Sequence, residues 1–355
     1  MSRREKGSLM TTLYIAFNKA LAIVDQHNDT WEVGFHLLES QPQCLAADPL
    51  YSQHIYCGTF NQGLWKSADA GSTWEQVGEG ITSEKVMSVA VGMPNQANST
   101  GIVYAGTEPG AIFRSEDQGT SWQELTALRE LPSASTWSFP PRPWTSHIRW
   151  IAPDPLIAGR LFAAVEAGAL IRSLDGGLTW EDRRPDGPFD THTLVLPRLA
   201  RNRLYSAAGD GFMHPGNGFV QSNDGGETWF RPDDGLDYHY LWSLAVDPAD
   251  PETLVVSAAP GPRQAHDAPP TAESAIYRRS GNSPWQMIRE GLPQAQGLQA
   301  SVLATNEAEP GVFYAATNQG IFRSSDTGLS WEHLPIPWPA DIYPGHVHAF
   351  IVVPG

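Results

Sequence analysis

The chain has 355 residues, of which 41% are hydrophobic, and its 33 glycines and 29 prolines are typical of a turn-rich soluble globular protein. Its formal net charge of −16 would repel a phosphate backbone, and no cluster of Lys and Arg offsets that repulsion, so nucleic acid is excluded as an expected partner. No apolar run reaches about 18 residues, so we expect no membrane span and no membrane partner.

The start of the chain resembles a short signal sequence, because a basic stretch precedes the apolar residues 9–17. No small-residue cleavage site follows, and residues 13–17 fit a β-strand instead. We therefore expect a cytoplasmic protein whose residues 1–10 are disordered. Cys44 and Cys57 are too few for a disulfide framework or a cysteine zinc cage, and we expect two free buried thiols on neighbouring strands.

A short motif of the form S-x-D-x-G-x-[ST]-W recurs along the chain. Its Asp and Ser/Thr oxygens can accept hydrogen bonds from turn amides, its Gly permits a positive φ, and its Trp covers the turn with an apolar face. The five copies are residues 67–74, 115–122, 173–180, 222–229 and 324–331. Each copy predicts a β-turn that its own side chains stabilise.

Two degenerate copies complete the series, one ending at Trp31 and one at Trp285. The seven Trp positions are 43 to 58 residues apart, within or just above the period of about 40 to 50 that four-stranded propeller blades need. The sequence therefore predicts an all-β fold, a seven-bladed β-propeller of four-stranded antiparallel blades.

Two β-rich runs precede each motif, for example residues 55–59 and then 63–67 in the second unit. An apolar first strand lies upstream, as at residues 44–49. The first unit opens at Leu13 without such a strand, whereas residues 348–353 form one with no unit after it. We predict that this C-terminal strand joins the first blade and closes the ring, which leaves no free sheet edge between the ends.

The motif resembles the Asp-box, or BNR repeat, of sialidase-like β-propellers in the WD40/YVTN-like superfamily, and the repeats extend this resemblance over nearly the whole chain. It implies one propeller domain spanning residues 1–355. Sialidases of this group have six blades, an Arg-Ile-Pro motif and three carboxylate-binding arginines, and the absence of that motif here argues against sialidase activity. Seven-bladed Asp-box propellers also resemble the halves of xyloglucan-degrading glycosidases and the non-catalytic photosystem assembly factors.

Two segments, residues 123–146 and 258–275, exceed the repeat and are candidate functional loops. The usual antiparallel strand order places the first between a fourth and a first strand and the second between a second and a third strand. Both then emerge on one face of the disc. The Asp-boxes lie on the opposite face, so we expect them to be structural turns outside the functional site.

The loops between second and third strands, together with the starts of the first strands, converge on the channel mouth of the first face. Convergent His, carboxylate, Arg and aromatic groups in a concavity are typical of a small-molecule site. The candidate catalytic residues are Glu108, Glu166, Asp210, Asp190 and His192. The candidate ligand-binding residues are His147, Arg149, His239, Tyr240, Trp242, Arg263, His266, Asp267, His346 and His348. Each has a structural alternative, such as a solvating acid, a histidine bonded to a carbonyl, or core packing of Trp242.

Two functions remain open at this point, and so does the question of catalysis. The first is binding of a small-molecule or glycan-like ligand, with glycosidase-type hydrolysis by Glu108 and Glu166 as an extension. The residues identify no cofactor and we assign no metal ligand, although His147, His192 and His239 with an acid would suit a divalent cation. The second is a non-catalytic platform that holds a protein partner through residues 123–146.

Overall fold

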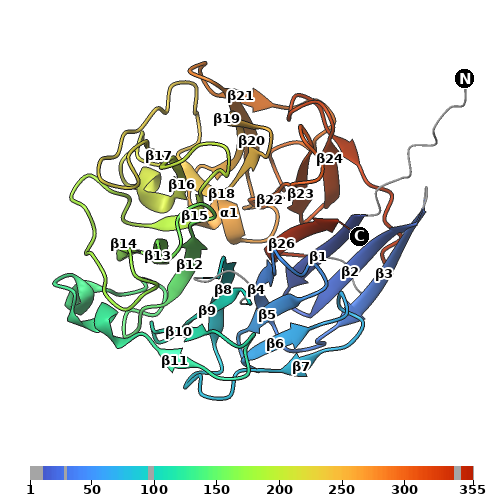
Figure 1. Ribbon diagram of the computed structural model, residues 1–355. Helices are drawn as coiled ribbons and strands as arrows, with labels where there is room; N and C mark the ends of the chain where they lie inside the picture. The colour runs from blue at the N-terminus through green and yellow to red at the C-terminus, as the bar shows by residue number, and fades with distance from the viewer. Residues whose placement is uncertain (1–10, 28–29, 95–99, 340–344, 355) are drawn as a thin grey trace, which may run out of the picture.

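The computed structural model describes residues 11–27, 30–94, 100–339 and 345–354. Seven antiparallel sheets are arranged as blades around a central axis (Figure 1). The predicted all-β, seven-bladed propeller is therefore confirmed. The prediction for residues 1–10 lies outside the described residues. In the described part of the chain, no helix is long and apolar enough to cross a membrane.

The blades follow one another in chain order. Blade one contains β26 (Val347–Pro354), β1 (Thr11–Phe17), β2 (Ala20–His27) and β3 (Thr30–His36). Blade two contains β4 (Pro42–Ala47), β5 (Ile55–Thr59), β6 (Leu64–Ser67) and β7 (Glu75–Gln76). Blade three contains β8 (Val86–Gly92), β9 (Ile102–Thr107), β10 (Ile112–Ser115) and β11 (Gln123–Glu124). Within each sheet the strands are hydrogen-bonded in this order, from the channel outward.

Blade four contains β12 (Ile148–Pro153), β13 (Leu161–Val165) and β14 (Ala169–Ser173), and blade five contains β15 (Thr191–Val195), β16 (Leu204–Ala208) and β17 (Phe219–Ser222). In these two blades an isolated bridge, Arg172 with Glu181 and Gln221 with Phe230, stands where the others have a fourth strand. Blade six contains β18 (Tyr240–Asp247), β19 (Asp250–Ala259), β20 (Ala275–Ser280) and β21 (Gln286–Ile288). Blade seven contains β22 (Val302–Ala304), β23 (Phe313–Thr317), β24 (Gly320–Ser324) and β25 (Glu332–His333).

The ring closes through its two ends, as predicted. The C-terminal β26 pairs antiparallel with β1, from Thr11 opposite Pro354 to Ala16 opposite Ala349, and Figure 1 shows the red β26 beside the blue β1. Buried side chains of both strands, such as Ile15 and Phe350, belong to one hydrophobic cluster that also includes residues of blade seven. The last strand thus completes the first blade and seals it against the seventh.

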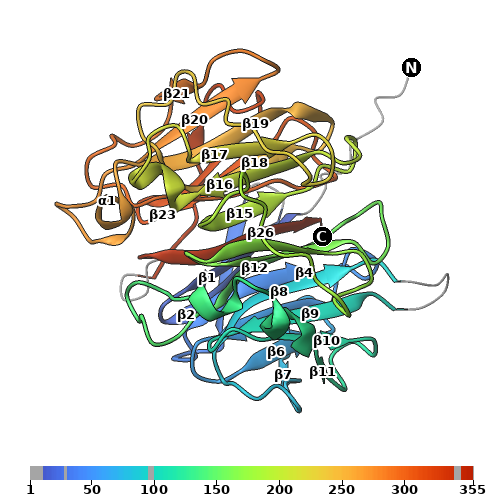
Figure 2. The same cartoon turned by 90° about the vertical axis from the view of Figure 1, so that its left-hand side faces the viewer.

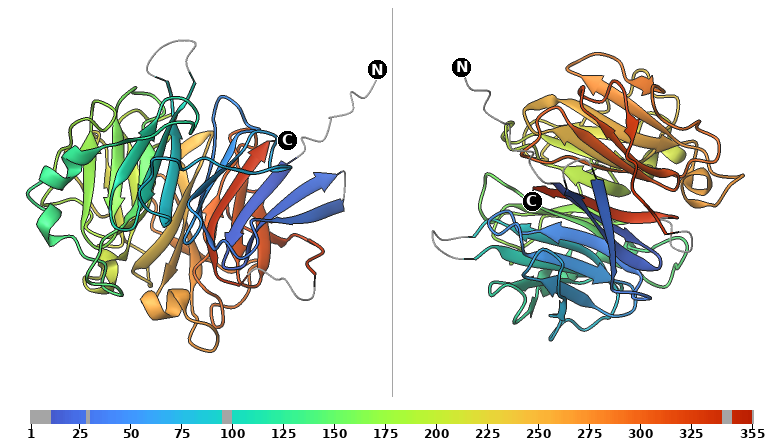
Figure 3. Two further views of the ribbon diagram at one scale, coloured as in Figure 1. Left: turned by 90° about the horizontal axis from the view of Figure 1, so that it is seen from below. Right: turned by 90° about the vertical axis from the view of Figure 1, so that its right-hand side faces the viewer.

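The two long segments each carry short helices. Residues 123–146 contain η1 (Thr126–Glu130) and η2 (Ala134–Thr136), between β11 and β12. Residues 258–275 contain α1 (Pro262–His266), between β19 and β20, while η3 (Gly209–Phe212) follows β16. Figures 2 and 3 show α1 at the end of the ring where β26 begins, away from the C-terminus.

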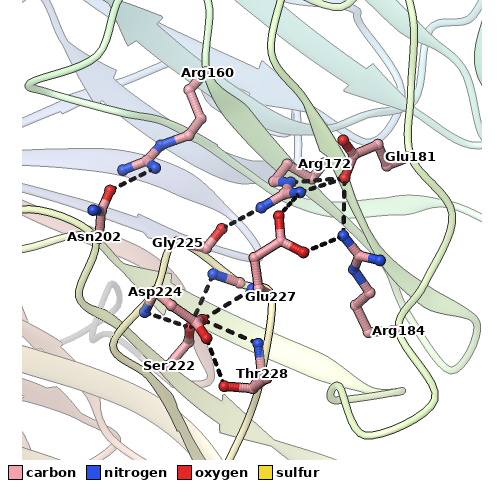
Figure 4. Close-up of polar contacts among 11 residues, drawn as sticks. Arg160, Arg172, Glu181, Arg184, Asn202, Ser222, Asp224, Gly225, Glu227 and Thr228 are labelled. Carbon is pink, nitrogen blue, oxygen red and sulfur yellow. Dashed lines mark hydrogen bonds and ion pairs between the residues drawn. The ribbon is translucent and has the colours of Figure 1, made fainter.

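The Asp-boxes form the predicted turns, and the copy in blade five shows their chemistry (Figure 4). Ser222 Oγ donates to Asp224 Oδ1 at 2.8 Å and accepts from the Gly226 amide at 2.9 Å. Asp224 also accepts from the Thr228 amide at 3.0 Å and from its hydroxyl at 2.6 Å. Gly225 and Gly226 have φ values of 78° and 88°, a region that favours glycine. In the other four copies the Asp likewise accepts one hydrogen bond from the hydroxyl of the first Ser and one from the hydroxyl of the later Ser or Thr.

Arginines tie blade four to the Asp-box of blade five. Arg172 donates to the Gly225 carbonyl at 2.8 Å and also pairs with Glu181 and Glu227 (Figure 4). Burial acts to lower the pKa of Arg172, but the hydrogen bonds to Glu227 and Glu181, together with their charges, outweigh it and raise the pKa. The turns therefore connect neighbouring blades as well as strands within a blade.

We expect Asp224→Ala to lower the free energy of unfolding by about 1 to 2 kcal/mol, because the Thr228 amide and hydroxyl lose their acceptor. Burial acts to raise the pKa of Asp224, but the hydrogen bonds from Thr228 and Ser222 outweigh it and lower the pKa to about 2. The stabilisation is thus present above the carboxyl's ordinary pKa of about 4 and is lost as the pH falls through about 2. Urea unfolding at neutral and acidic pH measures this difference.

Asp224→Asn is the matched control, since its amide oxygen still accepts from the turn while the charge is removed. We expect it to lose less stability than Asp224→Ala. An Asp224→Ala protein as stable as the parent at neutral pH would contradict the structural role of the turn.

Cys44 on β4 and Cys57 on β5 are both free and buried, as predicted. Their strands are neighbours, with Cys44 opposite Gly58 and Leu45 opposite Cys57. Burial raises the pKa of the Cys44 thiol to about 12, so it stays protonated near neutral pH. Both thiols therefore act as small apolar groups in the core of blade two.

Candidate functional site

The inner strand of each blade, the one nearest the axis, faces a central channel with a cavity of about 350 Å³. Most of its lining is apolar, from side chains such as Val89, Val246 and Leu303. Arg149, Trp242 and His348 line it near the starts of their strands. The polar part of the channel is thus its mouth at the end that carries α1 (Figure 2).

A β-bulge interrupts six inner strands close to where they begin, which the sequence did not reveal. In each case one residue is skipped in the pairing with the second strand, so two residues oppose one. The extra residues are Gln43, Met87, Arg149, His192, Trp242 and His348. Because a bulge redirects a side chain, the six bulges explain how residues from separate blades gather at one level. All of them except His192 line the cavity.

Glu166 is the centre of the first polar group at the mouth. His147 Nε2 lies 2.6 Å from Glu166 Oε2, and Arg149 Nε lies 3.8 Å from the same oxygen. Burial acts to raise the pKa of Glu166, but the hydrogen bond to His147 and the charges of His147 and Arg149 outweigh it and hold the pKa well below its ordinary value. Glu166 is therefore a carboxylate, and its side chain remains 14% exposed.

Asp190 and His192 lie next to Glu166. Asp190 Oδ1 accepts from the Ala167 amide at 2.8 Å, and Asp190 Oδ2 lies 3.6 Å from His192 Nε2. His192 is fully buried, with Nδ1 2.7 Å from the Leu241 carbonyl oxygen. Burial and the nearby Glu166 charge raise the pKa of Asp190. One donor atom from each of Glu166, Asp190 and His192 lies within 4.8 Å of the other two.

The two remaining candidate acids, Asp210 and Glu108, have other hydrogen-bond partners. Asp210 Oδ2 accepts from the backbone amides of Phe189 and Asp190 at 3.1 Å each, and burial raises its pKa. Glu108 is buried, and burial acts to raise its pKa, but Arg142 outweighs this and lowers it, with help from Lys85. Arg142 Nε and Nη2 donate to the two Glu108 oxygens at 2.8 and 2.5 Å. The first inserted loop thus reaches the mouth through an arginine that the sequence did not single out.

An aromatic layer covers the other side of the mouth. The Arg149 guanidinium lies 4.4 Å from the centre of the Trp242 ring, and the rings of His192 and His266 lie 4.7 and 4.3 Å from it. Tyr240 Oη is 3.2 Å from His266 Nε2. Trp242 therefore packs in the core and also joins the groups of blades four, five and six.

Three histidines continue this layer to the first blade. The His346 ring lies 5.2 Å from that of His266 and 5.0 Å from that of His348. His348 Nε2 is 2.6 Å from Asn18 Oδ1, in the loop between β1 and β2. Burial, followed by the charge of Arg149, lowers the pKa of His346 to about 4, and burial with the neighbouring His346 lowers that of His348 to about 3. These rings are neutral near neutral pH.

Three candidates do not join this group. Arg263 has a 78% exposed side chain and pairs with Asp267 along α1 at 3.2 Å. His239 has a different neighbour, the Gly216 amide, which lies 3.4 Å from its Nδ1. Among the described residues, the group that could hold a metal ion is Glu166, Asp190 and His192, and it includes neither His147 nor His239. The i,i+4 spacing of Arg263 and Asp267 was the sequence signal for their own pairing.

Known proteins similar in sequence are xyloglucanases. No family model matches the chain. It is 26% identical over 256 residues to a xyloglucanase from Paenibacillus sp., covering 60% of this chain and 24% of that protein. It is 25% identical over 283 residues to the xyloglucanase Xgh74A of Acetivibrio thermocellus, covering 66% of this chain and 32% of that protein. The chain therefore spans about a quarter to a third of the length of these relatives.

Solved structures agree on the architecture. An ancestral GH74 enzyme aligns with a TM-score of 0.60 and 16% identity, covering 98% of this chain and 40% of that one. YCF48 from Cyanidioschyzon merolae aligns with a TM-score of 0.56 and 12% identity, covering 92% and 89%. YCF48 bound to D1 peptide aligns with a TM-score of 0.55 and 17% identity, covering 82% and 81%. The chain is a seven-bladed β-propeller with Asp-box turns. At these identities the structural likeness shows the fold alone.

Proposed function

We propose that the channel mouth binds a small polar ligand of the glycan type. The observation that carries this proposal is a set of buried polar atoms at the mouth that have no hydrogen-bond partner among the described residues. They are His147 Nδ1, Arg149 Nε, His192 Nε2, His266 Nδ1 and His346 Nδ1. Buried polar groups nearly always form hydrogen bonds, so several without one in the same place favour a bound polar molecule.

A glycan fits the character of the mouth. Sugars present many hydroxyls, which can both donate and accept, and neutral imidazoles and carboxylates offer the complementary groups. The cavity, at about 350 Å³, is within the range of small-ligand sites, roughly 300 to 1,000 Å³. The similarity to xyloglucanases supports the same class of ligand.

Hydrolysis would be a further step, for which Glu108 and Glu166 were the expected pair. Both oxygens of Glu108 bind Arg142, so the geometry favours Asp190 as the partner of Glu166. One carboxyl oxygen of each lies within 4.8 Å of one of the other, close to the separation of about 5 to 5.5 Å in retaining glycosidases. Catalysis and the cytoplasmic location stay predictions.

We expect Arg149→Gln to weaken glycan binding at least about tenfold, because one charged or bidentate donor contributes roughly 1.5 to 3 kcal/mol. Xyloglucan oligosaccharides and simple sugars are screened by thermal shift, since a ligand of the folded state raises its stability, and hits are quantified by calorimetry. The matched control is Arg203→Gln. Arg203 forms an ion pair with Glu252, beside the turn that joins β18 to β19, at the opposite end of the channel. Equal affinity in Arg149→Gln and the parent would reject the site.

A protein-binding platform is the second candidate, favoured by Trp144. This side chain is 79% exposed in the first inserted loop, and exposed tryptophans are common anchors in interfaces. The alignment with YCF48, which was solved with a bound D1 peptide, covers 82% of this chain and 81% of that one. In the same screen, a panel of labelled peptides tests this candidate: peptide binding that Trp144→Ala abolishes and Arg149→Gln leaves intact would favour the platform.

A further inference from the structure

We propose that Glu166, Asp190 and His192 form a binding site for a divalent transition cation, Zn²⁺ or Mn²⁺, at the channel mouth. The inference goes beyond glycan binding, and it uses three residues of the same mouth. The sequence led us to assign no metal ligand, and of the three histidines that it offered as suitable, His147, His192 and His239, His192 alone belongs to the structural cluster.

His192 is already arranged as a metal ligand. Its Nδ1 lies 2.7 Å from the Leu241 carbonyl oxygen, which can only accept, so Nδ1 must carry the proton. With Nδ1 as the donor, Nε2 is the nitrogen that can face a metal ion, and this buried atom has no hydrogen-bond partner among the described residues. Metal-binding histidines almost always use their second nitrogen in this way, to donate to a carbonyl or carboxylate.

The three donor atoms have suitable separations. His192 Nε2 and Asp190 Oδ2 are 3.6 Å apart, as two ligands would be if each lay about 2.1 Å from one ion in a near-tetrahedral arrangement. All three donors lie within 4.8 Å of one another, a little beyond the maximum of about 4.2 Å for one such ion. A small change in the side-chain torsions of Glu166 or Asp190 would bring all three donor atoms within that distance of one another.

Carboxyl groups are concentrated at this place. Glu166, Asp190 and the adjacent Asp210 contribute three of them, and Glu166 is contacted by His147 at 2.6 Å and by Arg149 at 3.8 Å. The side chains of Glu166 and Asp190 are 14% and 21% exposed, so an ion can reach them from the mouth. A divalent cation would offset the repulsion between the carboxylates in a poorly solvated place.

The mixed donor set selects the kind of ion. An imidazole with two carboxylates suits Zn²⁺ or Mn²⁺, whereas Ca²⁺ and Mg²⁺ prefer oxygen ligands alone. Three protein donors leave coordination positions open. Hydroxyls of a bound sugar could occupy them, which would link this site to the ligand proposed above.

Calorimetric titration of chelator-treated protein with Zn²⁺ and with Mn²⁺ tests the site, with Ca²⁺ and Mg²⁺ as comparison ions. We expect one high-affinity ion per chain and at least about a hundredfold loss of affinity in His192→Ala, since even residues that only support a ligand contribute 10- to 100-fold. His239→Ala, at a nearby histidine outside the cluster, should bind as the parent does. An anomalous difference peak between the three side chains would support the placement.

Asp190→Asn serves if His192→Ala fails to fold, because it nearly preserves shape while removing one charged donor. Absence of stoichiometric binding by the parent protein, or unchanged affinity in Asp190→Asn, would overturn the inference. Glycan binding measured in the presence of chelator separates the two proposals. Sugar binding without metal binding would leave the glycan site standing and reject the cation, and metal binding without sugar binding would do the reverse.

Discussion

Deletion of residues 346–355 is expected to abolish the folded monomer. The strand β26 supplies the inner strand of blade one, and its Val347, Phe350, Val352 and Val353 side chains are all less than 9% exposed. Without it, β1 would present an unpaired edge and blade one would lose its contact with blade seven. Size-exclusion chromatography with light scattering and melting curves would report aggregation or loss of the cooperative transition.

Complementation makes this prediction specific to the strand. A synthetic peptide of residues 346–354 added to the truncated chain should restore a melting transition, because its pairing with β1 replaces the missing inner strand of blade one. A scrambled peptide of equal composition should not, since the pairing register places Val347, Phe350, Val352 and Val353 in the core. In the full chain, Phe350→Ala should cost about 3 kcal/mol through the cavity it leaves. A truncated monomer that melts at the parent's temperature would contradict ring closure.

The sequence predicted the repeat architecture because local chemistry encodes it. The Asp-box of residues 222–229 contains its own acceptor, donors and glycines, so the turn can be recognised without knowing what packs around it. Two strands precede each Asp-box by a few residues. In blade two, for example, the run predicted at residues 55–59 forms β5 (Ile55–Thr59). The pairing of β26 with β1 was predictable by count, since one blade lacked a first strand and one strand lacked a blade.

The geometry of the mouth could not be predicted in the same way. A β-bulge depends on how one residue is accommodated against the neighbouring strand, and nothing in the residues around Arg149 or Trp242 marks it. The pairing of Glu108 with Arg142 joins residues 34 positions apart through an irregular loop. The sequence therefore indicated which strands approach the mouth, while the partner of each acid depended on tertiary structure.

His346 and His348 are expected to make the fold sensitive to mild acid. In the folded state their pKa values are lowered to about 4 and about 3, mainly by burial, whereas in the unfolded chain they return to the ordinary value of about 6.5. Below about pH 6.5 the unfolded chain binds protons that the folded protein does not, so stability falls as the pH is lowered and levels off below about pH 3. Both rings are partly exposed, so we expect a combined loss of about 2 kcal/mol at about pH 5.

Urea unfolding at a series of pH values from about 8 to about 4.5 measures this loss. The double variant His346→Gln with His348→Gln removes both titrating groups, so its stability should change less over this range even if it is lower throughout. His214→Gln, at an exposed histidine, is the control and should keep the parent's pH dependence. If the double variant loses stability as steeply as the parent, the two rings are not held neutral by burial, and the aromatic layer at the mouth is more open to water than the contacts of His346 with His266 and of His348 with Asn18 imply.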